Sequence, residues 1–236
     1  MLKSKIALAL DGLSLEKAAR LTVSLGVWLR AVKVHDLLDA IGPLVITVIR
    51  GLGGTPWVDY KIHDTKDTVV LRVKALVRNG AKIITVHASG GVPMMKAAVE
   101  ATVSDSGDMM AEIWAVTVLT SLDDEEIGRI YGKDRTREQI VREFALMAKE
   151  AGVRTVVCSA QEVRMLSNDP ELQGMEFTVP GTRSAGVALG QQKRSGTPAQ
   201  AIEDGTTCLV AGSQVTKAED PFEAFKSMAA EIDMEI

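Results

Sequence analysis

The segment PWVDYKIHDTKDTVVLRVKALVRNGAKIITVHA, residues 56–88, contains the pattern that decides the fold. It begins with a short, mostly apolar run at 56–62 and ends with a β-branched run at 82–88, and both are typical of buried strands. Between them, residues 65–79 have the apolar spacing of an amphipathic helix, and Gly80 follows where helices commonly end. This order predicts a βαβ unit with two parallel strands.

The same alternation continues along the rest of the 236 residues. Apolar, β-branched-rich runs recur at eight places: 5–11, 28–34, 56–62, 82–88, 112–119, 154–160, 175–180 and 207–212. Helical patterns separate most of these runs, which predicts an α/β fold of the (β/α)8 type, a TIM barrel. A doubly wound open sheet is the structural alternative. No linker or change in composition divides the chain, so we expect one domain over residues 1–236.

Several helix starts carry capping signals. Ser14 is expected to precede the first helix, and Ser121 to precede an acidic one. Thr197 and Asp220 are each followed by a proline, with Gln or Glu at the third helical position. These signals predict helices that begin directly after the four residues.

The composition is that of an ordinary globular protein, with 46% hydrophobic and 25% charged residues. The net charge of -4 argues against a nucleic-acid-binding protein, which usually presents a basic face. No apolar run approaches the roughly 20 residues that span a membrane, and Asp11 interrupts the N-terminal segment too early for a signal peptide. We therefore expect a cytoplasmic protein that binds neither nucleic acid nor membrane. Cys158 and Cys208 lie in apolar runs and are expected to be buried and reduced.

Charged residues interrupt the run at 56–62. Because side chains alternate along a strand, Asp59 and Lys61 are expected on one face, with the apolar residues between them on the other. The apolar face suits contact with surrounding helices. The charged face would then point into the barrel, near the C-terminal mouth where barrel enzymes hold their catalytic residues.

Other strand ends bring further charged residues to this mouth. Asp11 ends the first strand, and Lys33 lies near the end of the second. Four residues can form an alternating array with zero net charge: Lys33, Asp59, Lys61 and Asp64. Opposite charges in such an array keep each other ionised, which suits proton transfer and destabilisation of a bound anion. A structural ion network is the alternative.

Three histidines in the sequence could suggest a metal site. His35, His63 and His87 are scattered single residues, which are more often hydrogen-bonded structural residues than ligands. We therefore expect no metal site.

The motif Asp-x-Lys-x-x-Asp at 59–64 resembles the signature of the orotidine 5′-phosphate decarboxylase family. The likeness extends over most of the chain in the family's order: ALALD (7–11), AVKV (31–34), TVHASGG (85–91), VTVLTSL (116–122), VCSAQE (157–162), TVPGTR (178–183) and GQQKRSGTPAQAIEDG (190–205). Together these motifs are specific, whereas the first alone is shared by related phosphate-binding barrels. Lys33 favours the metal-free decarboxylase over magnesium-dependent relatives such as 3-keto-L-gulonate 6-phosphate decarboxylase and hexulose-phosphate synthase, because a protonated lysine cannot bind a metal.

The resemblance implies conversion of orotidine 5′-phosphate to uridine 5′-phosphate in de novo pyrimidine biosynthesis, with no metal, flavin or other cofactor. Lys61 would stabilise the carbanion that develops at pyrimidine C6 and deliver the proton that replaces CO₂. Asp59 would lie against the substrate carboxylate, and Lys33 would hold the array and contact the ribose. The resemblance also implies a homodimer in which Asp64 and Thr68 come from the partner subunit.

The remaining substrate contacts also follow from the resemblance. Asp11 would bind the ribose and the Thr120 region the pyrimidine edge. The residues expected near the phosphate follow strands seven and eight: Pro180, Arg183, Gln192, Gly212 and Ser213. The segment between Pro180 and Gln192 contains three glycines and is a candidate lid.

Three departures separate this chain from the family's pattern. Ser213 stands where the family has a phosphate-binding arginine. The missing charge is expected to weaken phosphate binding roughly tenfold to a hundredfold, unless Lys193, Arg194 or Lys217 compensates. Residues 65–67, Thr-Lys-Asp, replace Ile-Pro-Asn, and His35 replaces a glycine. Two alternatives therefore remain: a related barrel enzyme for a different sugar phosphate, and a catalytically silent paralogue that binds a nucleotide or serves as an assembly partner.

Overall fold

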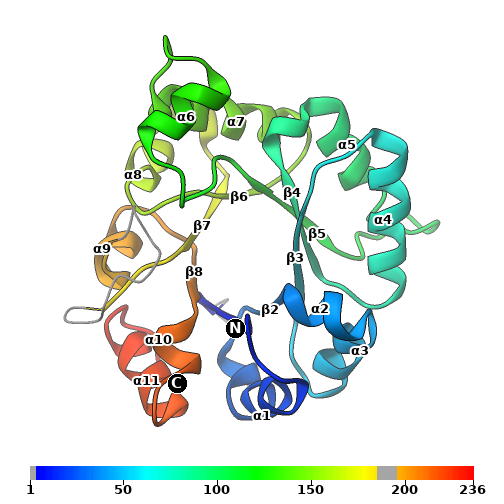
Figure 1. Ribbon diagram of the computed structural model, residues 1–236, viewed down its shortest axis with the longest axis vertical. Coiled ribbons are helices and arrows are strands. Elements are labelled where there is room, and N and C mark those ends of the chain that lie inside the picture. Colours follow the sequence, from blue (N-terminus) through cyan, green and yellow to red (C-terminus); the bar gives the residue numbers. More distant parts are fainter. Residues whose placement is uncertain (1–3, 185–195) are drawn as a thin grey trace.

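The eight predicted strands are all present and form a closed parallel barrel in sequence order (Figure 1). The computed structural model describes residues 4–184 and 196–236. The strands are β1 (Ile6–Ala9), β2 (Ala31–Val34), β3 (Pro56–Ile62), β4 (Ile83–His87), β5 (Glu112–Val116), β6 (Thr155–Val157), β7 (Glu176–Pro180) and β8 (Cys208–Ala211). Because β8 pairs with β1, the barrel closes, and the alternative of an open doubly wound sheet is wrong.

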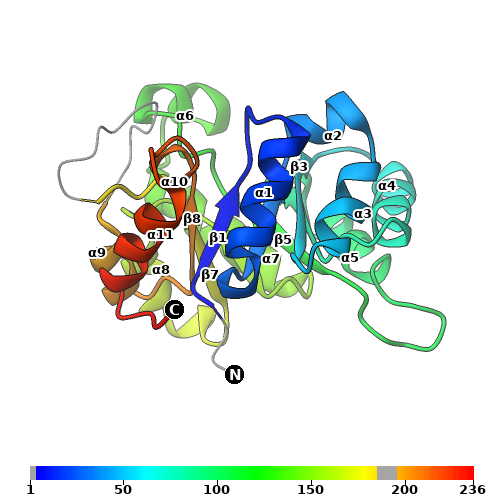
Figure 2. The ribbon, with the colours of Figure 1, turned by 90° about the horizontal axis from the view of Figure 1, so that it is seen from below.

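Helices surround the barrel (Figures 1 and 2). They are α1 (Leu15–Leu25), α2 (Asp36–Ile41), α3 (Leu44–Gly51), α4 (Lys66–Arg78), α5 (Val92–Glu100), α6 (Asp124–Tyr131), α7 (Arg137–Glu150), α8 (Val163–Ser167), α9 (Pro198–Glu203), α10 (Ser213–Thr216) and α11 (Pro221–Ala230). Short 3₁₀ turns cover Gly26–Trp28, Ala88–Gly90 and Pro170–Leu172. In the described part of the chain, no helix is long and apolar enough to cross a membrane.

Three of the four predicted helix starts are confirmed. The side chains of Ser14, Thr197 and Asp220 accept hydrogen bonds from backbone N–H groups in the first turns of α1, α9 and α11. The prediction for Ser121 is wrong, because α6 begins after Asp123. Asp123 accepts from the N–H of Glu126 while the Glu126 side chain accepts from the N–H of Asp123, and this reciprocal capping box fixes the start.

The largest side chains of the cluster inside the barrel are two tryptophans. Trp57 on β3 and Trp114 on β5 are fully buried, with ring centroids 4.6 Å apart. Small residues on the first two strands, Ala7, Ala9 and Ala31, belong to the same interior cluster and leave room for the indoles. The barrel is therefore solid below its mouth, as the tight closure of eight strands requires.

Both cysteines are buried and free, as predicted. Cys208 lies in the interior cluster, and burial raises the pKa of its thiol to about 12. Since the thiolate is the reactive form, we expect no modification of Cys208 by a thiol reagent at pH 8 in the folded protein. Mass spectrometry should locate both modified cysteines only after unfolding in guanidinium chloride. Rapid labelling of Cys208 in the folded protein would contradict its position in the barrel.

Candidate active site

β3 departs from regular strand geometry where it carries its charged residues. The register between β3 and β4 shifts between Val58 and Ile62. Within this irregularity, Lys61 has a φ of 46°, in the left-handed region that non-glycine residues rarely adopt. Such strain costs about 1–3 kcal/mol and is concentrated at functional sites. The conformation accompanies a direct contact of Lys61 Nζ with Asp59 Oδ2, at 2.7 Å.

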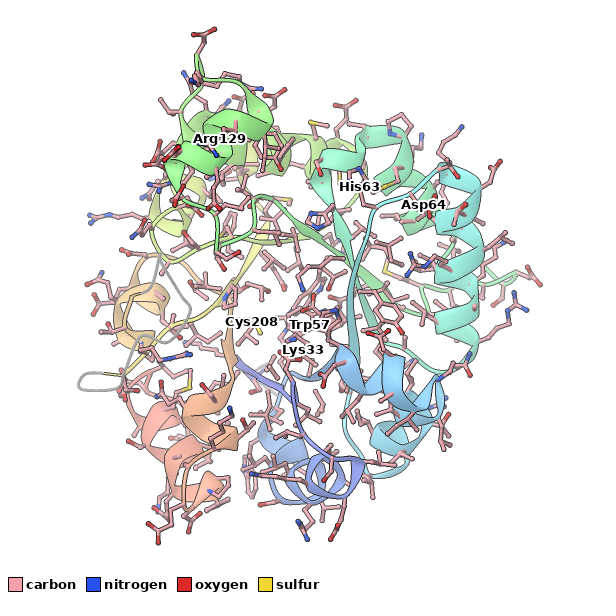
Figure 3. The ribbon with its side chains drawn as sticks, viewed as in Figure 1. Lys33, Trp57, His63, Asp64, Arg129 and Cys208 are labelled. Carbon is pink, nitrogen blue, oxygen red and sulfur yellow. The ribbon has the colours of Figure 1, made fainter. Side chains whose placement is uncertain are left out.

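The ends of β1, β2 and β3 bring four charged groups into one ion network. Lys33 Nζ lies 2.8 Å from Asp11 Oδ2 and 3.1 Å from Asp59 Oδ2. Lys61 Nζ contacts the same oxygen of Asp59. Figure 3 shows Lys33 inside the barrel beside Trp57. The structure thus joins Lys33, Asp59 and Lys61 within one chain, and Asp11 is the fourth member of the network.

The two central groups of this network are buried and stay ionised. The side chains of Lys33 and Asp59 are 8% and 9% exposed. Burial alone would lower the pKa of Lys33, but the carboxylates of Asp59 and Asp11 outweigh this effect and raise it. Burial alone would raise the pKa of Asp59, but the ammonium groups of Lys33 and Lys61 outweigh this effect and lower it. The network therefore presents one carboxylate between two ammonium groups at neutral pH.

The lowered pKa of Asp59 predicts a loss of stability in acid. Its ion pairs stabilise the fold above the unfolded-state pKa of roughly 4, and this stabilisation disappears as the pH falls through the lower folded-state value. We expect Asp59→Asn to reduce the free energy of unfolding at pH 7 and to weaken its pH dependence below about 4. Urea unfolding at several pH values measures this, with the exposed Asp105→Asn as control. An acid dependence equal to that of the wild type would contradict the role of Asp59.

The network lies in a pocket of about 450 Å³ at the carboxyl ends of the strands. The opposite side of the pocket is formed by residues after β5, β7 and β8. Six of the predicted substrate-binding residues line it: Asp11, Thr120, Pro180, Arg183, Gly212 and Ser213. The pocket therefore has a charged wall from the first three strands and a second wall that includes the predicted phosphate region.

Two predicted site residues lie outside this pocket in a single chain. Asp64 is exposed, and its Oδ1 accepts from the N–H of Thr65 at 2.7 Å. Thr68, in the first turn of α4, shares a hydrogen bond of 3.1 Å with the Thr65 hydroxyl. Figure 3 shows Asp64 beside α4, away from Lys33. Gln192 and most of the candidate lid, together with Lys193 and Arg194, lie outside the described residues.

The histidines are spread around the mouth of the barrel. The rings of His63 and His87 lie 5.9 Å apart, while His35 lines the pocket on another side. Burial lowers the pKa of His87, and the nearby His63 and Lys61 lower it further. Across residues 4–184 and 196–236, no three His, Cys, Asp or Glu side chains are grouped as a metal site requires.

Trp57 was not predicted as a site residue, and Lys217 was predicted only as one of three cations that could compensate for Ser213. Trp57 forms part of the pocket lining, and the inward spacing of Trp57, Asp59 and Lys61 along β3 was a usable signal. Lys217 lines the opposite wall. It follows Ser213 by four residues, one helical turn, which was the signal that both share a face.

A closed parallel barrel, with a buried ion network and a pocket at the carboxyl ends of its strands, defines a (β/α)8 barrel enzyme. Residues 4–228 match the model of the orotidine 5′-phosphate decarboxylase / HUMPS family, and the chain belongs to this family. The resemblance seen in the sequence motifs is thereby confirmed.

Individual relatives agree with this assignment. The chain is 39% identical to an orotidine 5′-phosphate decarboxylase from Moorella thermoacetica, over 98% of this chain and 93% of the relative. It is 40% identical to one from Idiomarina loihiensis, over 92% of this chain and 93% of the relative. The crystal structure of orotidine 5′-phosphate decarboxylase from Lactobacillus acidophilus has a TM-score of 0.82 and 29% identity, covering 98% of this chain and 99% of that one.

Proposed function

We propose that this protein decarboxylates orotidine 5′-phosphate to uridine 5′-phosphate, a step of pyrimidine biosynthesis. The observation that carries the proposal is the Lys33–Asp59–Lys61 network in the wall of the pocket. Family membership and the names of the relatives support the substrate. We expect the reaction to need no metal, flavin or other cofactor.

The chemical step follows from the charges of the network. The bond between pyrimidine C6 and the carboxylate breaks, CO₂ leaves, and the electron pair stays on C6. The ammonium of Lys61 stabilises this charge and then transfers its proton to C6, and the lysine regains a proton from water. Because the negative charge at C6 exists only as the bond breaks, a fixed ammonium there stabilises the transition state more than the bound substrate.

Asp59 destabilises the bound substrate in the same step. Its lowered pKa keeps it ionised, so a substrate carboxylate placed beside it is repelled until CO₂ departs as a neutral molecule. Lys33 holds Asp59 in place and is itself kept protonated by Asp59 and Asp11. Two ammonium groups at this position repel a divalent cation, which supports a reaction without a metal.

The other pocket residues are assigned to parts of the substrate. Asp11 and Lys33 contact the ribose, and Thr120 lies at the pyrimidine edge. The phosphate is held near the ends of β7 and β8 by a group of residues: Pro180, Arg183, Gln192, Gly212 and Ser213. The position of the described members in one pocket supports this assignment.

The active enzyme is a homodimer whose two sites are shared between subunits. Asp64 and Thr68 complete the pocket of the partner chain. Neither lines the pocket of its own chain, and Leu71, one turn after Thr68 on α4, is 67% exposed. Thr68 and Leu71 are three residues apart on α4 and share a face, and Asp64 directly precedes the N-cap Thr65, so a second chain can cover all three.

Ser213 is the observation that favours a second candidate function. This residue lines the pocket where the family pattern has an arginine, so the same barrel could act on a different sugar phosphate. Product analysis by NMR after incubation with orotidine 5′-phosphate, 3-keto-L-gulonate 6-phosphate or a hexulose phosphate separates the two. We expect only orotidine 5′-phosphate to react, with uridine 5′-phosphate as product. Turnover of another compound instead would overturn the proposal in favour of the second candidate.

A further inference from the structure

Charge is distributed unevenly between the two walls of the pocket. On the β1–β3 wall, Lys33 and Lys61 are both paired with carboxylates. On the opposite wall lie two further cations, Arg183 and Lys217. Neither makes an ion pair with any residue in the described ranges, which makes them the cations available to a ligand.

The acids nearest to Lys217 in the chain do not neutralise it. Asp220 caps α11, where its Oδ1 accepts from the N–H groups of Phe222 and Glu223 at 2.9 and 3.1 Å. Glu219 is exposed, and within the described part of the chain it forms no ion pair with Lys217. Lys217 therefore lines the pocket without an ion-pair partner among the described residues.

The backbone around both cations is tied together. Gln214 in α10 accepts from the N–H of Ser184 and donates to its hydroxyl, which links α10 to the segment after β7. Arg183 in this segment donates from Nη1 to the carbonyl of Thr182 at 2.9 Å. Lys217 ends the α10 turn, its N–H bonded to the carbonyl of Ser213 at 3.1 Å. The link holds both cations at the same end of the pocket.

The unpaired charge on the second wall of the pocket matches a phosphate monoester. Among residues 4–184 and 196–236, the charged lining residues are four cations, Lys33, Lys61, Arg183 and Lys217, and two carboxylates, Asp11 and Asp59. The net charge of +2 comes from the wall where the cations are unpaired. A dianionic group is the chemistry that neutralises it, and each charge-assisted hydrogen bond adds to the binding of such a group.

We propose that Lys217, together with Arg183, binds the phosphate of the substrate and supplies the charge that Ser213 does not. Identification of the ligand as a uridine nucleotide rests on the proposed function, whereas phosphate binding by Lys217 does not. Lys217 is thus a specificity residue for phosphorylated over unphosphorylated ligands.

Quenching of tryptophan fluorescence can measure the affinity, because Trp57 lines the pocket. Uridine 5′-phosphate, uridine and ribose 5-phosphate are titrated into wild type, Lys217→Gln and Lys217→Arg. Lys226→Gln is the control, since Lys226 is an exposed lysine on α11 that pairs with Glu223. We expect Lys217→Gln to weaken binding of both phosphorylated ligands about tenfold, with uridine unchanged and Lys217→Arg close to wild type.

A second substitution tests the compensation directly. In the Lys217→Gln background, Ser213→Arg should restore the affinity for uridine 5′-phosphate, because it returns one cation to the same wall. If ribose 5-phosphate responds as expected but no uridine compound binds, Lys217 is confirmed and the proposed substrate is wrong. If uridine 5′-phosphate binds equally well to wild type and Lys217→Gln, the role of Lys217 is wrong and the proposed substrate stands. Absence of binding by any phosphorylated ligand overturns the inference.

Discussion

Lys61→Ala is expected to abolish decarboxylation while leaving the fold intact. The substitution removes both the proposed proton donor and the proposed cation at C6, so we expect a fall in kcat of at least about 10⁴-fold. The fold should tolerate the change, because the Lys61 side chain is 31% exposed and Asp59 keeps its contact with Lys33 at 3.1 Å. Turnover is followed by the loss of substrate absorbance, and folding by circular dichroism and thermal unfolding.

Two further variants make this result specific. Lys226→Ala removes an exposed lysine far along the chain, and it should retain full activity. Lys61→Arg keeps the positive charge, but guanidinium does not release its proton at neutral pH, so it should remain severely impaired. Near-normal turnover by folded Lys61→Ala would show that another group delivers the proton.

The second large effect tests the proposed sharing of each active site between two subunits. Asp64→Ala and Lys61→Ala should each be inactive alone, yet a mixture of the two should recover activity. In a heterodimer, one pocket receives both defects and the other receives neither. If subunits exchange at random, about one quarter of all pockets become complete, so activity should approach one quarter of wild type.

The exchange experiment carries its own control. Subunits are mixed after mild dissociation in urea, and the mixture is compared with each variant treated alone. Asp105→Ala, an exposed loop substitution, should be active both before and after the treatment. Failure of a mixture with demonstrated heterodimers to regain activity would mean that Asp64 acts within its own chain or has no role.

Much of the fold could be predicted because its signals are local. The run at 56–62 became β3 with the predicted limits, and the signals at Ser14, Thr197 and Asp220 all mark helix starts. The prediction for Ser121 was wrong because Asp123, two residues later, caps the helix instead. Closure of the barrel depends on the pairing of β1 with β8, which no local pattern contains.

The site was predictable only in part, because some of its contacts depend on packing between distant segments. Alternation along β3 correctly placed Asp59 and Lys61 toward the pocket, but it did not reveal the positive φ of Lys61. The pairing of Lys33 with Asp11 depends on how β1 lies against β2, and so it follows from packing. Lys217 is one of three candidate compensating cations in the sequence, and its place in the pocket depends on where α10 lies.

The most direct test of the proposed activity is formation of uridine 5′-phosphate from orotidine 5′-phosphate by the purified wild-type protein in excess EDTA. In the proposed mechanism the charged network provides both the stabilising cation and the proton, so we predict turnover that EDTA leaves unchanged. Absence of turnover by folded, dimeric protein would contradict the proposed function. Turnover that EDTA abolishes would contradict the metal-free mechanism.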